Sequence, residues 1–276
     1  MEKFPLSLDM SLTSFLSQPH FREKFKQEFP KPSLKIKKEI LAPPLTEDNP
    51  LIGTAFDYLL RFQLKQLNPQ AWSGNWVAER AIELMVRGKG EDVYQKGNQI
   101  ISKIKKPYLE FLETGEITDK LIESALSLSK LDFFYRTRKF DKTQTDSRHV
   151  QDLRGLIEQF NPDIFPSDGK ISLNPEFGLG SVIVGGADAD LVIGDLLIDV
   201  KTISTLELKR DDFNQLIGYY TLSKIDQIDG TDPQQEIKRI GIYFSRYAYL
   251  HVIEVDQVID PAKFPAFLEW FRGQFN

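Results

Sequence analysis

Acidic and basic residues cluster near the middle of this chain, around two apolar runs that are joined by a tight turn. Leu191–Ile193 and Leu196–Ile198 flank Gly194-Asp195, and a glycine at the first turn position favours a two-residue type II′ hairpin. The hairpin fixes which residues face each other across the two strands. The pairs expected from this register are Ile193 with Leu196, Asp190 with Asp199, and Asp188 with Lys201.

Alternation of side chains gives this hairpin two different faces. One face is apolar and the other carries three carboxylates and an ammonium group at its open end. Like charges opposite each other destabilise a sheet, and a hard divalent cation with oxygen ligands relieves the repulsion. The pattern therefore predicts a metal site, provided that the register does not slip by one residue. The apolar face is formed by Ala189, Leu191, Ile193, Leu196, Ile198 and Val200, and the charged face by Asp188, Asp190, Asp199 and Lys201.

The members of the charged face are not equivalent. Asp190 and Asp199 are the main candidate ligands, whereas Asp188 is either a third ligand or an ion-pair partner of Lys201. Neighbouring carboxylates favour the protonated form of Lys201. We therefore expect this lysine to orient a nucleophile and to offset charge instead of acting as a base. The alternative is an acidic, solvated hairpin end, because two acids and a lysine at such spacing often occur by chance.

The arrangement Asp190…Asp199-Val-Lys201 resembles the signature of the PD-(D/E)XK nuclease superfamily. The resemblance implies that Asp190 and Asp199 are catalytic residues that hold Mg²⁺ or Mn²⁺. It also implies that Lys201 helps to orient and activate the attacking water. The fold that it implies is a restriction-endonuclease-like core.

Two further segments resemble the RecB-like, lambda-exonuclease-like branch of this superfamily. Gln215-Leu-Ile-Gly-Tyr219 is similar to the QxxxY element, which implies that both end residues steady the site and contact the nucleic acid. Gly53-Thr-Ala-Phe-Asp57 resembles the early helix, with Asp57 in place of the metal-ligating His or Glu of that branch. The resemblance covers Gly53–Phe62 loosely and Val182–Tyr220 well.

Simpler interpretations exist for both segments. Residues four apart lie on one helix face, so Gln215 and Tyr219 also fit a surface polar pair. Asp57 precedes Arg61 by four, which fits an ion pair near a helix N-terminus.

The composition narrows the classes of cofactor. The chain has 276 residues and no cysteine, which excludes disulfides and an iron–sulfur cluster held by cysteines. His20, His149 and His251 are isolated, which argues against zinc. No apolar run has the length of a membrane span, and the N-terminus lacks a signal-peptide core, so we expect a cytoplasmic protein with no membrane partner.

The charge balance does not by itself identify a nucleic-acid-binding protein. The formal net charge is −5, although a local basic patch matters more than the total. Taken singly, each basic segment is expected to be a solvated face or loop. These segments are Lys31–Lys38, Lys103–Lys106, Arg136–Lys142 and Lys209-Arg210.

The order of elements predicts an α/β fold (an α+β mixed sheet) that is flanked by helices, with a largely helical N-terminal half. Residues 1–50 are expected to form an N-terminal arm, and residues 51–276 a single nuclease-like domain with a helical insertion at 72–160 and a sheet core at 171–276. The expected helices are Leu51–Leu67, Trp76–Arg87, Glu91–Ile104, Ile117–Phe134, Val150–Phe160, Asp211–Ile225 and Pro261–Phe275. The expected strands are Gly180–Val184, Asp188–Ile193, Leu196–Ile203, Ile237–Phe244 and Tyr249–Val255.

The sequence thus predicts a nuclease, dependent on Mg²⁺ or Mn²⁺, that hydrolyses phosphodiester bonds in nucleic acid, DNA more than RNA. Two other classes remain open: a non-catalytic module on the same fold that binds nucleic acid or protein, and a structural or Ca²⁺-stabilised domain. Endo- or exonuclease action, a protein partner and homo-oligomer formation also stay open.

Overall fold

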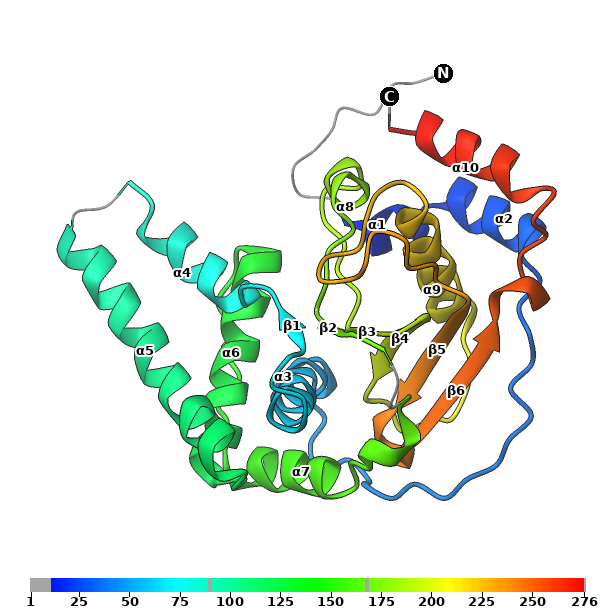
Figure 1. Cartoon of the computed structure of the whole chain (residues 1–276). Helices are drawn as coiled ribbons and strands as arrows, with labels where there is room; N and C mark the ends of the chain where they lie inside the picture. Colours follow the sequence, from blue (N-terminus) through cyan, green and yellow to red (C-terminus); the bar gives the residue numbers. More distant parts are fainter. Residues whose placement is uncertain (1–10, 89–90, 167–168, 276) are drawn as a thin grey trace.

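The computed structural model describes residues 11–88, 91–166 and 169–275, so the first ten residues of the expected N-terminal arm lie outside the described part (Figure 1). Helices dominate up to residue 164, and the sheet follows. The helices are α1 (Leu12–Leu16), α2 (Pro19–Glu28), α3 (Asn49–Leu67), α4 (Val77–Val86), α5 (Glu91–Thr114), α6 (Asp119–Thr137), α7 (Ser147–Glu158), α8 (Leu179–Ile183), α9 (Arg210–Ser223) and α10 (Phe264–Gly273), with single 3₁₀ turns η1 (Pro162–Ile164), η2 (Ser245–Tyr247) and η3 (Val255–Gln257).

A mixed sheet forms the centre of the molecule. Its six strands lie in the order β1-β2-β3-β4-β5-β6. The pairs β1–β2 and β4–β5 are parallel and the others are antiparallel. The α/β class and the mixed sheet are therefore confirmed. The strands are β1 (Trp72–Ser73), β2 (Ile171–Leu173), β3 (Leu191–Ile193), β4 (Leu196–Lys201), β5 (Arg239–Phe244) and β6 (Tyr249–Glu254).

The central hairpin has the predicted turn and register. Leu191 pairs with Ile198 and Ile193 with Leu196. Gly194 has a φ of 55°, a left-handed conformation that glycine adopts without steric cost. The ladder between β3 and β4 ends at Leu191, so the charged residues lie just beyond its last pair.

Beyond this last pair the predicted hairpin differs from the structure. Asp188 forms an antiparallel bridge with Glu176 on the β2 side, and no bridge joins it to Lys201 among the described residues. Ala189 packs in the core on the α9 side of the sheet, whereas Leu191 packs on the other side, so the two residues do not share a face. The expected pairing of Asp188 with Lys201 and the expected position of Ala189 are wrong.

The strand predicted at Gly180–Val184 is also wrong, because this segment forms α8. Ser181 Oγ accepts a hydrogen bond from the Phe177 amide at 2.8 Å and donates one to the Ala187 carbonyl at 2.6 Å. These bonds favour a helical turn over the β-branched pattern of the segment. The strand of the sheet in this region is β2, which the sequence pattern did not indicate.

The predicted helices are present, with shifted ends. The largest difference is α5, which continues through Pro107 to Thr114 instead of ending near Ile104. The region expected to be a helical insertion also contains β1. Among the described helices, none has both the length and the apolar composition needed to cross a membrane.

Two hydrophobic cores lie on opposite faces of the sheet. Leu191 and Ile198 point into the core with α3, α6 and α7, whereas Val192 and Leu197 point into the core with α9. In Figure 1, α3 lies between the sheet and the group formed by α4, α5 and α6. This alternation confirms the period of two that defined the hairpin faces.

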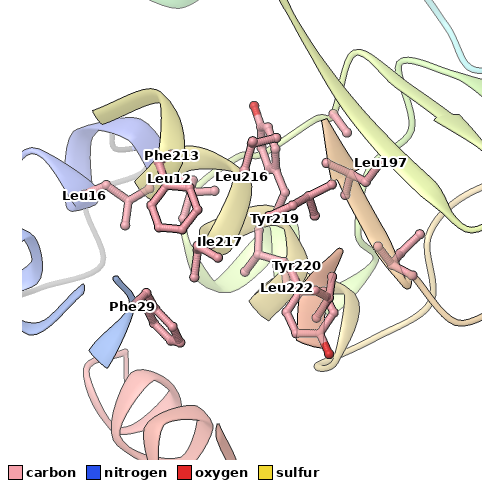
Figure 2. Close-up of a cluster of buried hydrophobic side chains, with 14 of the residues drawn as sticks. Leu12, Leu16, Phe29, Leu197, Phe213, Leu216, Ile217, Tyr219, Tyr220 and Leu222 are labelled. Atoms are coloured by element: carbon pink, nitrogen blue, oxygen red, sulfur yellow. The ribbon is translucent and has the colours of Figure 1, made fainter. Parts of the chain in front are cut away.

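The helices α1 and α2 pack onto α9 and α10. Figure 2 shows Leu12 and Leu16 beside Phe213 and Ile217 of α9. A side-chain carbon added at Gly218 of α9 would lie 3.1 Å from both leucines, so the two helices are in close contact. Aromatic pairs join α2 to α10, including Phe25 with Phe267 and Phe21 with Trp270, whose ring centroids are 5.2 Å and 5.5 Å apart.

A buried ion pair holds the segment between α2 and α3 against the rest of the fold. The side chains of Arg246 and Asp152 are fully buried and 2.8 Å apart. The Arg246 guanidinium also donates to the Ala42 carbonyl at 2.9 Å, and the Leu45 amide donates to Asp152 at 2.9 Å. One arginine therefore links this segment to α7 and to the end of β5.

Candidate functional site

A chain of polar contacts connects β4 with α9 at the open end of the hairpin. The Lys201 ammonium lies 2.9 Å from Asp199 Oδ2 and donates a hydrogen bond to Gln215 Oε1 at 3.0 Å. Gln215 Nε2 in turn donates to the Tyr219 hydroxyl at 2.7 Å. Four residues that the sequence singled out are thereby in one connected group.

The position of Asp190 follows from the end of the ladder. It is the residue before β3, and its Oδ2 accepts a hydrogen bond of 2.6 Å from the Val200 amide of β4. Burial raises the pKa of Asp190 well above its ordinary value, and the negative charges of Asp57 and Asp199 raise it further. Three carboxyl groups from α3, β3 and β4 are therefore close enough to repel one another.

Asp57 reaches this group from α3, on the other side of the sheet. The helix contacts the end of β4, because a side-chain carbon at Gly53 would lie 3.9 Å from Thr202. Asp57 Oδ2 forms an ion pair of 2.6 Å with Arg61, and both side chains are largely buried. Burial nevertheless raises the pKa of Asp57, since it outweighs the attraction of Arg61. The i,i+4 ion pair suggested by the sequence is confirmed.

Buried carboxylate oxygens at the site lack hydrogen bonds. Among the described residues, Asp57 Oδ1 and Asp199 Oδ2 have no hydrogen-bond partner. Asp199 Oδ2 is nevertheless in direct contact with the Lys201 ammonium, 2.9 Å away. Asp199 is only 2% exposed, and its pKa is raised by burial despite the attraction of Lys201. Of these two oxygens, Asp57 Oδ1 is the one without a cation in contact among the described residues.

The pKa of Lys201 is raised, so its ammonium group stays protonated. Burial alone would lower the pKa of this lysine, but Asp199, Asp212 and Asp190 together raise it above its ordinary value. The expected protonated lysine agrees with this direction. Burial also raises the pKa of Tyr219, and the charge of Asp199 adds to the effect, so its hydroxyl stays neutral.

Asp188 lies at the edge of the group and has a different partner. Its Oδ2 is 3.4 Å from Arg136 of α6, which also forms an ion pair of 2.6 Å with the buried Asp132. The interpretation of Asp188 as an ion-pair partner of Lys201 is therefore wrong. Its charge still contributes to the raised pKa of Asp57.

Two functional candidates were missed in the sequence. Asp212 Oδ1 lies 3.7 Å from Lys201, and its buried Oδ2 has no hydrogen-bond partner among the described residues. Asp212 precedes Gln215 by three residues on a helix, and this spacing places both on one face, so the sequence could have indicated that Asp212 lies near the site. Arg136 gave no such signal toward Asp188, because the two residues meet only through the packing of α6 beside the sheet.

The chemistry of the donor set fits a hard divalent cation. Mg²⁺ commonly uses one or two carboxylates together with waters and substrate phosphate oxygens. Asp190 and Asp199 supply such a pair. Across residues 11–88, 91–166 and 169–275, no group of three or more His, Cys, Asp or Glu side chains has the spacing to hold a metal ion. Asp57 and Asp188 are each paired with an arginine, and their role as metal ligands remains a prediction.

Comparisons with models of protein families, with curated proteins and with solved structures returned no match.

Proposed function

We propose that this protein is a metal-dependent nuclease that hydrolyses phosphodiester bonds, with DNA as its substrate. The observation that supports the proposal most is the connected group of Asp190, Asp199, Lys201, Gln215 and Tyr219. Burial and neighbouring carboxylates raise the pKa values of Asp190 and Asp199, and a divalent cation bound between them would relieve this electrostatic cost.

In this proposal each side chain has a distinct role. Asp190 and Asp199 would hold Mg²⁺ or Mn²⁺, and the metal would supply Lewis-acid chemistry at the scissile phosphate and at a water. Lys201 keeps its proton, orients the attacking water and stabilises negative charge on the phosphate. Gln215 fixes the position of the Lys201 ammonium through their 3.0 Å hydrogen bond, and Tyr219 fixes Gln215 in turn.

One observation favours a second candidate, a non-catalytic module that binds nucleic acid. Arg61 already neutralises Asp57 at 2.6 Å, and Lys201 already neutralises Asp199 at 2.9 Å. A site whose charges are internally paired can be retained for binding alone. The two candidates differ in whether Asp199 is needed for turnover or only for structure.

The test compares cleavage of linear and circular DNA, single- and double-stranded, with Mg²⁺, with Mn²⁺ and with EDTA. The informative variant is Asp199→Asn, which keeps the shape of the side chain. Its matched control is Asp195→Asn in the turn at the other end of the same hairpin, where the carboxylate pairs with Arg239. Circular dichroism and thermal melting establish that both variants fold.

The nuclease requires metal-dependent cleavage by wild type and Asp195→Asn, and its loss in folded Asp199→Asn. Cleavage of circles separates endonuclease from exonuclease action. Absence of cleavage in every condition, together with equal DNA affinity in wild type and Asp199→Asn, supports the binding module instead. Equal cleavage by both variants overturns the assignment of the site.

A further inference from the structure

The C-terminal end of α6 combines basic and aromatic residues and lies beside the carboxylate group. The sequence from Phe133 to Lys142 reads Phe-Phe-Tyr-Arg-Thr-Arg-Lys-Phe-Asp-Lys. As a sequence it was expected to be only a solvated basic segment. In the structure Arg136 contacts Asp188 at 3.4 Å, which brings this segment to the edge of the candidate site.

A cleft of about 690 Å³ runs between this segment and the sheet. Its helical wall includes residues of α4 and of the end of α6, and the opposite wall includes Asn174, Glu176, residues 185–188 and Asp229; residues at the start of α1 and around β1 complete the lining. A second cleft of about 790 Å³, between α4, the start of α5 and α6, shares Arg80, Tyr135 and Arg138 with the first. The two clefts therefore adjoin at these three residues, and Asp188 belongs to the lining of the first.

The two walls of the first cleft differ in charge. Arg80, Arg136 and Arg138 come from the helical wall, whereas the carboxylates of Glu176, Asp188 and Asp229 come from the opposite wall. Arg80 and Glu176 form an ion pair of 2.6 Å across the cleft, with side chains 43% and 37% exposed. An ion pair this exposed contributes little stability, so an incoming phosphate can replace the glutamate.

Arg138 is the cation best placed to bind an anion. No carboxylate lies within ion-pair distance of it among the described residues. Its guanidinium lies over the Tyr135 ring, 5.0 Å from the centroid, and it donates to the Tyr135 carbonyl. Packing against the ring holds the charge in a defined place without neutralising it.

Aromatic rings are exposed along the same segment. Tyr135 is half-buried and lines both clefts, and Phe140 is 68% exposed with its ring 4.8 Å from that of Phe134. Exposed rings next to cations suit unpaired bases, because stacking on aromatic side chains tolerates any base. Paired bases in a duplex do not present their faces in this way.

We infer that the cleft formed by Arg80, Tyr135, Arg136 and Arg138 binds single-stranded nucleic acid and leads the strand to the carboxylate group. Arg138 and Arg80 contact backbone phosphates, and Tyr135 and Phe140 stack on bases. This inference rests on the proposed nuclease function, since it names the strand state of the substrate of the same site.

The test measures affinity without turnover. Fluorescence anisotropy in EDTA follows the binding of a labelled DNA strand of about 16 nucleotides, the upper end of the site size of one small single-strand-binding module. The matched RNA strand and the DNA duplex serve as further ligands. The variants are Arg138→Asn, Tyr135→Leu and Tyr135→Phe. Arg138 has a φ of 58°, and asparagine is among the residues best able to adopt this left-handed conformation.

We expect wild type to bind the single strand more tightly than the duplex. Arg138→Asn removes one phosphate contact, which lowers the affinity about fivefold near 0.1 M salt. The slope of log affinity against log salt concentration becomes shallower by about 0.7. Tyr135→Leu weakens binding by at least about fivefold, and Tyr135→Phe, which keeps the ring, restores it. The control is Lys263→Gln, which removes an exposed cation from the start of α10 and leaves the affinity unchanged.

Equal affinity of Arg138→Asn, Tyr135→Leu and Lys263→Gln, or duplex binding as tight as single-strand binding, overturns the inference. Tighter binding of the RNA strand than of the DNA strand supports the cleft as a binding site and identifies RNA as the substrate. Because EDTA removes metal-dependent turnover, the two proposals can fail separately. Intact strand binding without any metal-dependent cleavage overturns only the nuclease, and Asp199-dependent cleavage with unchanged affinity in the cleft variants overturns only the cleft.

Discussion

Replacing Lys201 by methionine is the most direct probe of the electrostatics of the site. The substitution keeps an unbranched side chain and removes the ammonium group that lies 2.9 Å from Asp199 and 3.7 Å from Asp212. Asp199 is 2% exposed, so water cannot replace the lost positive charge. The carboxyl group must then either ionise without a partner or take up a proton.

The free energy needed to protonate the Asp199 carboxyl group determines how much Lys201→Met destabilises the folded protein. The ordinary pKa of Asp199 is 3.8, and burial already raises it in the folded protein. Keeping it protonated against its unfolded value costs about 4 kcal/mol at pH 7 and about 2 kcal/mol at pH 5. Removing one partner of a buried ion pair costs about 3–5 kcal/mol, which agrees with the value at neutral pH.

The sign follows from linkage. A carboxyl group whose folded pKa is raised contributes stability that is fully present below its unfolded pKa and lost as the pH rises through the folded pKa. Lys201→Met raises the folded pKa of Asp199 further. We therefore expect the variant to lose more of its free energy of unfolding at neutral pH than at acidic pH.

Urea unfolding at both pH values, in EDTA and with Mg²⁺, measures the effect. The control is Lys263→Met, whose side chain is 75% exposed and whose loss leaves stability unchanged. If Asp190 and Asp199 hold Mg²⁺, the metal stabilises the variant and reduces its deficit at neutral pH. A deficit of equal size at both pH values refutes the reasoning, because it shows that the Asp199 carboxyl does not carry the cost.

Three further predictions concern single side chains. Tyr219→Phe removes one buried hydrogen bond and lowers thermal stability by about 1 kcal/mol; in a cleavage assay it lowers kcat, and an unchanged kcat contradicts a positioning role. Asp152→Ala leaves Arg246 buried without its carboxylate and costs about 3–5 kcal/mol in urea unfolding, with no rescue by Mg²⁺. Gly97→Ala places a carbon 2.7 Å from Ile82 and costs about 1–3 kcal/mol by overpacking α4 against α5, and a neutral result in thermal melting contradicts that packing.

Local patterns predicted the parts of the fold that depend on neighbouring residues. The turn at Gly194-Asp195 determined the register of Leu191–Ile193 with Leu196–Ile198, because a two-residue turn leaves one pairing. Helix α9 and its polar pair followed from spacing along one segment. Both features of the candidate site are encoded within about 30 residues, so the sequence pattern captured them.

Features that depend on distant segments were not predictable in this way. Segment Gly180–Val184 has a β-like composition, but the Leu179 amide before it donates a hydrogen bond to Asp226, 47 positions away, and the segment forms a helix. The pairing of Asp188 with Arg136 joins residues 52 positions apart. The position of Arg136 beside the sheet could not be predicted for the same reason, since the packing of α6 brings it there.

The close packing of α1 and α2 onto α9 and α10 has a consequence for synthesis of the chain. The partners are far apart in sequence: Arg210 of α9 donates to the Phe29 carbonyl across 181 positions. At ribosomal rates of about 5–20 residues per second, the apolar faces of the first helices remain without α9 and α10 for roughly 10–50 s. During translation we therefore expect the nascent chain to expose Leu12, Phe21 and Phe25 until α10 has emerged, and these apolar side chains are buried only in the complete fold.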